Sequence, residues 1–294
     1  MIGWMNWKMK SKSMSKIVYI SDFFFSEIRG GCEINDEELV QLLDNKGYTV
    51  VKCKTVDVSL DFLTENINNF FIISNFIGLK SPHKDFITHK CSYMLYEHDH
   101  KYVTSRNPAV YPNFKAPLED LINVEFYENA KKIFCQSSFH EKIIKSNLGL
   151  SNLWNVSGNL WSLESLEILE QLCDKQKKDA FSVLDSRTLH KNTFDAVRYC
   201  EAKKQQYELV SSPNYYTFLE MLGNNNKLIF FPQTPETLSR IVVEARMMNM
   251  KVLINKNVGA SYEPWFKTKG KDLITIMKNK RDEVCNKVIE VMNE

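Results

Sequence analysis

The sequence predicts an α/β protein built from two successive domains, each with a parallel sheet. Short apolar runs that read as strands alternate with segments of helical periodicity to about residue 150, and the alternation starts again near residue 180. Between these blocks, residues 163–180 change from an amphipathic helix to a basic polar stretch, which is typical of a domain boundary. We therefore expect a first domain over residues 1–165, a linker over 166–180 and a second domain over 181–294 that ends in a helix.

The first block opens with a strand, a loop and a helix. Residues 16–23 form a short apolar run, a loop with Gly30 and Gly31 follows, and the leucines of residues 34–47 have helical spacing that stops at Gly47. A second strand over 48–56 completes a β-loop-α-β unit, the seed of a parallel sheet. Further strands are expected at 68–76, 91–100 and 132–138, and helices at 119–130 and 139–149.

The second block repeats this order of elements. Strands are expected at 180–186, 207–212, 227–232 and 251–256, and helices at 193–204, 215–223, 237–249 and 282–292. Parallel-sheet domains bind ligands at the carboxyl ends of their strands. If those edges of the two domains face each other, the functional site lies in the cleft between them.

Composition limits the class of protein without naming a ligand. The chain has 294 residues, 44% hydrophobic and 25% charged, with a formal net charge of +2, so no strong overall field demands a polyanionic partner. Its seven cysteines are scattered without a C-x-x-C pair, which argues against a zinc site or a disulfide framework. The start lacks the apolar run of a signal peptide, and no stretch approaches the roughly 20 apolar residues that span a bilayer. We expect a cytoplasmic protein with no transmembrane segment.

The segment over residues 230–260 is the most informative part of the chain. A strand, a proline-containing turn, a helix and another strand follow one another, with Pro235 before the helix and Glu236 expected in or beside its first turn. The positive end of a helix and its free N–H groups suit a phosphate. Glu244 lies eight positions after Glu236, about 12 Å along a helix, so the two carboxylates could meet different parts of one ligand. An ordinary solvated helix is the alternative.

Glu236 and Glu244, with seven residues between them, resemble the E-x7-E motif of the family 4 retaining glycosyltransferases. The apolar strand that ends in proline and the glycine-containing loop near Gly259 also match. The resemblance implies the GT-B fold, in which two Rossmann-like domains face each other across a cleft. It implies that Glu236 faces the donor sugar and Glu244 holds the nucleotide ribose. We add the residues that flank the first glutamate, Pro235, Thr237 and Leu238, to the expected donor site.

Other parts of the chain resemble the same family in the same order. Gly30 and Gly31 stand where the family has a glycine pair near the donor phosphate, although a plain turn explains such a pair equally well. Arg187 and Lys191 follow the first strand of the second block, where the family places a basic pair against the diphosphate. His98, with Asp99 beside it, matches the histidine loop close to the reacting sugar.

The resemblance implies a nucleoside diphosphate sugar as donor, with a UDP-sugar expected, and no required metal. Cations at the diphosphate would stabilise the charge that develops on the leaving group. Transfer would proceed with retention, and no side chain is expected to act as a dedicated nucleophile. A related two-domain epimerase or phosphorylase, or a non-catalytic binding protein, remains an alternative function.

The acceptor is less well defined by the sequence. Basic residues interleaved with tyrosines suit a polyanion or stacked bases, so a hydroxymethylated DNA base is one expected acceptor, and a glycan is the other. As a whole, the chain also resembles compact glycosyltransferases encoded by tailed bacteriophages, which would place it in the host cytoplasm. The oligomeric state is unknown. The interleaved residues are Lys80, Lys84, Lys90, Tyr93, Tyr96, Lys101, Tyr102 and Arg106.

Overall fold

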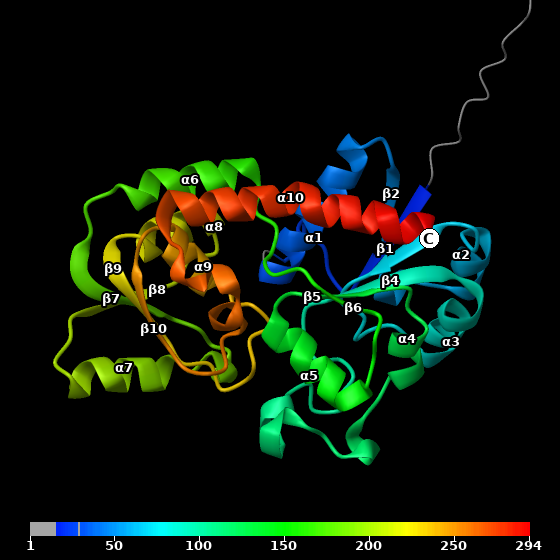
Figure 1. Cartoon of the computed structure of the whole chain (residues 1–294), viewed down its shortest axis with the longest axis horizontal. Helices are drawn as coiled ribbons and strands as arrows, with labels where there is room; N and C mark the ends of the chain where they lie inside the picture. Colours follow the sequence, from blue (N-terminus) through cyan, green and yellow to red (C-terminus); the bar gives the residue numbers. More distant parts are fainter. Residues whose placement is uncertain (1–15, 29) are drawn as a thin grey trace, which may run out of the picture.

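The computed structural model describes residues 16–28 and 30–294, and these fold around two parallel sheets (Figure 1). The segment that precedes residue 16, on which the expectation about a signal peptide rests, lies outside the described residues. The first sheet has the strand order β2-β1-β3-β4-β5-β6. Its strands are β1 (Lys16–Ser21), β2 (Thr49–Lys54), β3 (Phe70–Ile73), β4 (Ser92–Glu97), β5 (Ile133–Cys135) and β6 (Leu153–Asn155).

Helices cover both faces of the first sheet. Alternate residues of β1 belong to separate cores: Ile17 and Tyr19 pack with helix α1, while Val18 and Ile20 face the other way. Helix α1 (Gly31–Asn45) and the end of helix α10 (Gly270–Asn293) cover the first of these faces. The opposite face is covered by α2 (Leu60–Glu65), α3 (Ser81–Lys90), α4 (Val124–Glu128) and α5 (Ser138–Leu148).

The second sheet has four parallel strands in the order β10-β9-β7-β8. Helix α7 (Thr193–Ala202) covers one face, and α6 (Leu163–Cys173), α8 (Tyr215–Leu222) and α9 (Arg240–Met247) lie on the other (Figure 1). Leu166, Leu169 and Leu172 of α6 belong to this second core, so most of the helix within the expected linker packs with the second sheet. The strands are β7 (Lys178–Leu184), β8 (Tyr207–Val210), β9 (Asn225–Phe230) and β10 (Lys251–Ile254).

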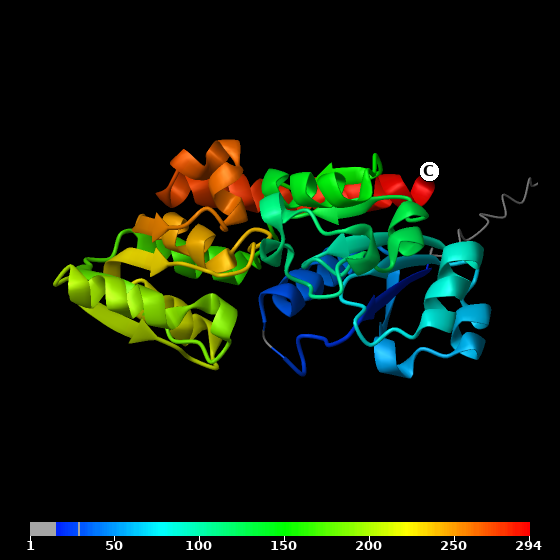
Figure 2. The same cartoon turned by 90° about the horizontal axis from the view of Figure 1, so that it is seen from below.

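Helix α10 joins the two halves of the molecule. Its first turns contribute Leu273 and Met277 to the second core, whereas Val284 and Val288 belong to the core of the first sheet. The turned view shows the two sheets in separate halves, with this helix running along both (Figure 2). The sequence predicted a terminal helix over 282–292 only; the observed helix of 24 residues starts twelve residues earlier.

The expected α/β alternation is present, with differences in the connections between strands 2 and 5. Helices α2 and α3 were missed, because both are short and their apolar positions are few. The helix expected over 119–130 is limited to α4, of five residues, after a 3₁₀ turn at Leu118–Asp120. Four further 3₁₀ turns lie in the loops at Thr55–Asp57, Pro108–Val110, Pro112–Phe114 and Leu189–Lys191, and two more at Gly259–Tyr262 and Pro264–Lys267.

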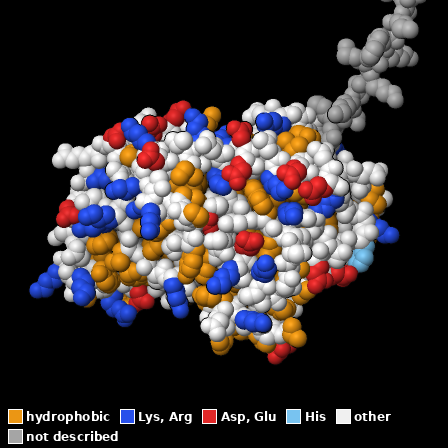
Figure 3. All heavy atoms as spheres, in the orientation of Figure 1, with side chains coloured by type: hydrophobic (Ala, Val, Ile, Leu, Met, Phe, Trp, Pro, Cys, Tyr) orange, Lys and Arg blue, Asp and Glu red, His pale blue; other side chains and the backbone are white. Residues whose placement is uncertain are grey.

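The aromatic part of the basic and aromatic surface that the sequence predicted in the first domain is not present at the surface. Tyr93, Tyr96 and Tyr102 are buried in the cores of the first sheet, so they offer no stacking platform to a base. Lys101 is also buried, where it pairs with Glu97. The face of the molecule in Figure 3 carries side chains of both charges.

Among the described residues, no helix is long and apolar enough to cross a membrane.

Candidate active site

The site forms where the order of strands reverses in each sheet. Strand β1 lies between β2 and β3, and β7 lies between β8 and β9. At such a point the loops that follow neighbouring strands turn to opposite faces of the sheet and leave a crevice. The loop after β1 leads to Gly31, and the loop after β7 leads to Lys191.

Two adjoining cavities occupy the space between the domains. The first has a volume of about 400 Å³ and is lined by both domains, with Gly31 on one side and Glu244 on the other. The second, of about 600 Å³, lies between the loops around Arg106 and His190. Because they share part of their walls, a ligand in one cavity can meet a ligand in the other. The side chains that line both are Cys32, His98, Lys191, Glu236 and Thr237.

Glu236 lies in an extended segment, which corrects the expectation of a helical first turn. Helix α9 begins four residues later, at Arg240, so the predicted 12 Å spacing along a helix does not apply. The Glu236 amide donates to the carbonyl of Asn257 at 2.7 Å, and the Gly259 amide donates to the carbonyl of Glu236 at 2.9 Å. A Cβ at Gly259 would stand 2.3 Å from the carbonyl oxygen of Thr237, so only glycine allows this close pairing.

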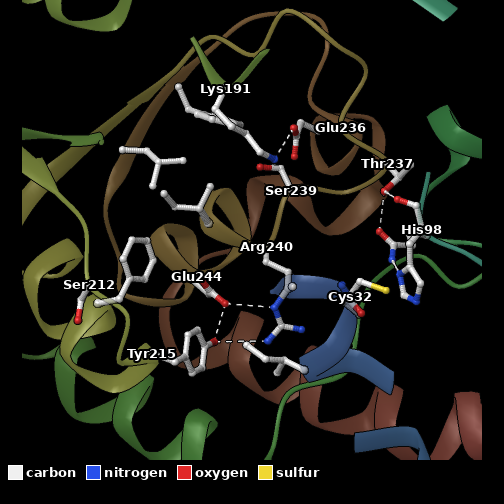
Figure 4. Close-up of a pocket in the computed structure, with 18 of the residues that line it drawn as sticks. Cys32, His98, Lys191, Ser212, Tyr215, Glu236, Thr237, Ser239, Arg240 and Glu244 are labelled. Carbon is white, nitrogen blue, oxygen red and sulfur yellow. Dashed lines mark hydrogen bonds and ion pairs between the residues drawn. The ribbon is translucent and has the colours of Figure 1, made fainter. Parts of the chain in front are cut away.

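An ion pair and an unsatisfied hydroxyl stand together at the start of α9. The Lys191 ammonium lies 2.7 Å from the Glu236 carboxylate, with Ser239 beside them (Figure 4). Ser239 occupies the N-cap position of the helix, with φ 78°, an uncommon value for serine. Its buried hydroxyl has no hydrogen-bond partner among the described residues. Since the first N–H groups of a helix also lack partners within it, this corner can bind an anion.

Glu244 lies in the middle of α9 and is buried at the end of the first cavity. Its Oε1 accepts hydrogen bonds from Trp161 Nε1 at 2.9 Å and from the Tyr215 hydroxyl at 2.6 Å. Arg240 Nε lies 3.5 Å from the same oxygen (Figure 4). Burial, and then the Glu244 charge, raise the pKa of Tyr215, so this phenol stays protonated and donates. The carboxylate is therefore held in one orientation while still lining the cavity.

Arg240 connects the two domains, and the sequence did not single it out. Its Nη1 donates to the carbonyl of Leu160 at 2.6 Å, and its guanidinium lies 4.4 Å from the centre of the Trp161 ring. A Cβ on Gly31 would stand 2.9 Å from Arg240 Cδ, so the glycine lets the start of α1 approach α9 closely. The position of Arg240, four residues before Glu244 on one helix, was the available signal.

His98 is held by side chains from three other segments. Its Nε2 lies 2.8 Å from the buried carboxylate of Asp36, and its Nδ1 contacts the amide nitrogen of Gln136. Gln136 Oε1 accepts from the Thr237 hydroxyl at 2.7 Å, which leaves its NH₂ group to donate to Nδ1. His98 Nε2 then carries the proton that Asp36 accepts.

Asp36 is charged in this arrangement. Burial alone raises its pKa, but His98, together with the hydroxyls of Ser74 and Tyr19, outweighs burial and holds the pKa below its usual value. Asp36 and Gln136 lie far from His98 along the chain, so the sequence carries no signal that they contact it.

Asp99 lines the second cavity and pairs with Arg106, whose Nε donates to its Oδ2 at 2.7 Å. Burial raises the pKa of Asp99, but Lys101, Arg106 and His100 together lower it below the ordinary value, so the carboxylate is charged. Its backbone is fixed as well, since the Asp99 amide donates to Glu97 at 2.8 Å and His140 Nε2 lies 3.0 Å from its carbonyl oxygen.

Four of the predicted donor residues do not line the first cavity. Pro235 lines only the second cavity, and Leu238, Arg187 and Gly30 line neither. Leu238 is fully buried in the second core. Arg187 is exposed on the loop after β7, and neither cavity includes it, unlike its predicted partner Lys191. Gly30 precedes α1 but is likewise outside both linings.

One group of side chains has the composition of a metal site. The ligand atoms of Cys32, Asp36 and His98 all lie within 4.8 Å of one another. They already bond to each other and to neighbours: His98 uses both ring nitrogens, and Asn75 Nδ2 lies 3.1 Å from Cys32 Sγ. The group therefore works as a hydrogen-bond network in this structure.

Comparison with solved structures defines the fold. Sucrose-phosphate synthase of Thermosynechococcus elongatus matches 95% of this chain and 98% of its own, with a TM-score of 0.58 and 10% identity. The catalytic domain of starch synthase IV from Arabidopsis thaliana, bound to ADP and acarbose, matches 95% and 99%, with a TM-score of 0.55 and 7% identity. An alpha-glucosyltransferase in complex with UDP and a 13-mer DNA containing a HMU base matches 95% and 99%, with a TM-score of 0.48 and 9% identity.

The chain thus has the fold of the GT-B glycosyltransferases, with two Rossmann-like domains that face each other across a cleft. This confirms the fold class that the sequence predicted. No protein-family model matches the chain, and a search of curated proteins finds no match.

Proposed function

We propose that the protein is a glycosyltransferase that moves a sugar from a nucleoside diphosphate sugar to an acceptor hydroxyl. The observation that carries the proposal is the corner of the first cavity where Lys191, the unsatisfied Ser239 hydroxyl and the start of α9 converge beside Glu244. The fold adds support, because sucrose-phosphate synthase and the starch synthase that binds ADP share it.

The donor would lie along the first cavity with its diphosphate at the start of α9. Lys191 and the free N–H groups of the helix would hold the phosphates, as the positive end of a helix favours anions. Glu244, fixed by Trp161 and Tyr215, would accept hydrogen bonds from the ribose hydroxyls. Glu236 would face the sugar at the wall shared with the second cavity. A UDP-sugar is the first donor to test.

In the transfer step a bond forms between the acceptor oxygen and the anomeric carbon, while the bond from that carbon to the phosphate oxygen breaks. The electron pair leaves with the phosphate, where Lys191 and the helix terminus stabilise it. His98, Asp99 and Glu236 already bond to Asp36, Arg106 and Lys191. We assign the role of base to none of the three, and the acceptor proton would pass to the leaving phosphate. We propose retention at the anomeric carbon, which the E-x7-E resemblance implies. Lys191 and the helix terminus supply positive charge at the leaving phosphate. We therefore expect transfer to continue when EDTA removes metal ions.

The test is release of nucleoside diphosphate by the full chain from a panel of nucleoside diphosphate sugars. Hydroxymethylated DNA and mixed saccharides would be the two acceptor pools. We expect release that depends on one donor and one pool, and that falls at least about 100-fold in Lys191→Ala, the usual cost of losing a donor to developing charge. Lys227→Ala is the matched control, since Lys227 pairs with Asp179 away from both cavities.

Two results would reject the proposal. One is the absence of acceptor-dependent release with every donor although the protein is folded. The other is release that Glu244→Gln and Lys191→Ala leave unchanged. Release without any acceptor, or release that requires phosphate, would indicate an epimerase or a phosphorylase instead.

A further inference from the structure

The second cavity has a mostly polar lining, in which Leu189 and Pro235 are the apolar members. Its described lining residues supply amide, hydroxyl, carboxylate and guanidinium groups, and none of them is Phe, Tyr or Trp. A nucleobase that is turned out of a duplex is normally held by stacking against aromatic or apolar side chains. The hydrogen-bonding residues confined to this cavity are Asn75, Asp99, Ser105, Arg106, Asn107, His190, Gln233 and Thr234.

The charges around this cavity are balanced in pairs. Arg106 is bonded to Asp99 and Lys191 to Glu236, so each cation of the described lining already has a carboxylate partner. Burial and then the nearby Lys191 lower the pKa of His190, which is therefore neutral at pH 7. A nucleic-acid groove needs cations that are available to phosphates. Because Lys191 is assigned to the donor phosphates, the described wall leaves an acceptor phosphate only Arg106, which is bonded to Asp99.

We propose that the second cavity is the acceptor site and that it binds an uncharged saccharide, whose hydroxyls the Asp99–Arg106 pair recognises. The inference rests on the proposed function and narrows its acceptor class. A carboxylate accepts and a guanidinium donates, so the pair can bond to neighbouring hydroxyls of one sugar ring.

The position of Asp99 suits this role. Its amide is bonded to Glu97 and its carbonyl lies 3.0 Å from His140 Nε2, so the carboxylate is held in place before an acceptor arrives. His98, the residue before Asp99, lines both cavities, so a sugar hydroxyl near Asp99 would lie next to the donor side of the cleft.

The experiment measures binding of methyl glycosides of the common hexoses to the full chain by saturation-transfer NMR, with UDP present. UDP binding is first measured alone by calorimetry. We expect at least one glycoside to bind, and Arg106→Ala to raise its dissociation constant at least about tenfold, as expected for lost hydrogen bonds to a charged group. UDP affinity should stay within about twofold of the wild type.

Arg198→Ala is the matched control, because Arg198 pairs with Asp195 on helix α7 outside both cavities. The inference is overturned if UDP binds but no glycoside does, or if a hydroxymethylated oligonucleotide binds in their place. It is also overturned if Arg106→Ala binds the glycoside as well as Arg198→Ala. Failure of UDP itself to bind would reject the proposed function, and this inference with it.

Discussion

At the scale of single residues, the Lys191–Glu236 pair places a competing carboxylate at the proposed phosphate site. The two side chains are partly exposed, so a bound diphosphate can replace Glu236 as the partner of Lys191. We expect Glu236→Gln to bind UDP a few-fold more tightly than the wild type, because the competing negative charge is gone. Sugar transfer by the same variant should fall. Calorimetry with UDP and a turnover assay measure the two effects, and weaker UDP binding would contradict the electrostatic argument.

Asp36 gives a second prediction at this scale. Asp36→Asn removes a buried charge that His98 and Ser74 bond, so we expect the free energy of unfolding at pH 7 to fall by about 1.5–3 kcal/mol. The pKa of Asp36 is lowered in the fold, so its stabilisation is complete above the ordinary value and is lost as the pH falls through the lowered one. Urea unfolding at several pH values checks this, with Asp44→Asn, an exposed residue of the same helix, as control.

The sequence predicted several site residues because they follow strands or belong to a motif. Lys191, His98, Glu236 and Glu244 were found this way, and all line the first cavity. The roles of Asp36, Gln136 and Arg240 depend on contacts that only folding creates. Asp36 and His98, for example, are 62 residues apart in the sequence but in contact in the structure. Arg187 lies on an exposed loop outside both cavities, so its pairing with Lys191 at the diphosphate stays a prediction.

At the scale of elements, the segment from Glu236 to Ser239 is the part that sequence periodicity misplaced. It looks helical next to α9, but hydrogen bonds to residues 257–260 hold it outside the helix. Tertiary pairing thus overrides local helical propensity here. Apolar runs predicted each described strand except β6, which has three residues and no such run. A strand such as β3 is easy to predict, because it is buried and apolar along its whole length.

Gly259 tests this pairing. A methyl group there would stand 2.3 Å from the Thr237 carbonyl oxygen and 2.8 Å from that of Glu236. We expect Gly259→Ala to displace the segment, to weaken UDP binding and to lower stability by about 1–3 kcal/mol, as overpacking does. Gly149→Ala is a control in which nothing lies within 4 Å, although its φ of 69° carries a backbone cost. Calorimetry and thermal unfolding of both variants measure the difference, and unchanged UDP binding in Gly259→Ala would contradict the account.

At the scale of the whole molecule, helix α10 and the hydrogen bonds between domains hold the two sheets around one cleft. Glu263, from the second domain, accepts from the amide of Ser138 at the start of α5. The sequence predicted two domains but not these ties, because a helix that serves two cores has no signal in its own periodicity.

Two buried histidines beside the cleft predict how the fold responds to acid. Burial lowers the pKa of His100 to about 4, and burial also lowers the pKa of His140. Both are neutral in the fold and protonate more readily once unfolded. Stability should therefore fall as the pH drops from about 6.5 to 4, by about 3 kcal/mol from His100 alone. Unfolding at stepped pH should show a smaller slope for His100→Gln than for the exposed control His89→Gln; equal slopes would contradict this.

The proposed function depends above all on binding of a nucleoside diphosphate in the first cavity through Lys191. The most direct measurement is calorimetry of UDP with the wild type, Lys191→Ala and the control Lys227→Ala. The account predicts that UDP binds the wild type and Lys227→Ala alike, and that Lys191→Ala binds about 10- to 100-fold more weakly, as expected for a lost hydrogen bond between charged groups. Equal affinity in all three proteins, or no binding to the wild type, would contradict it.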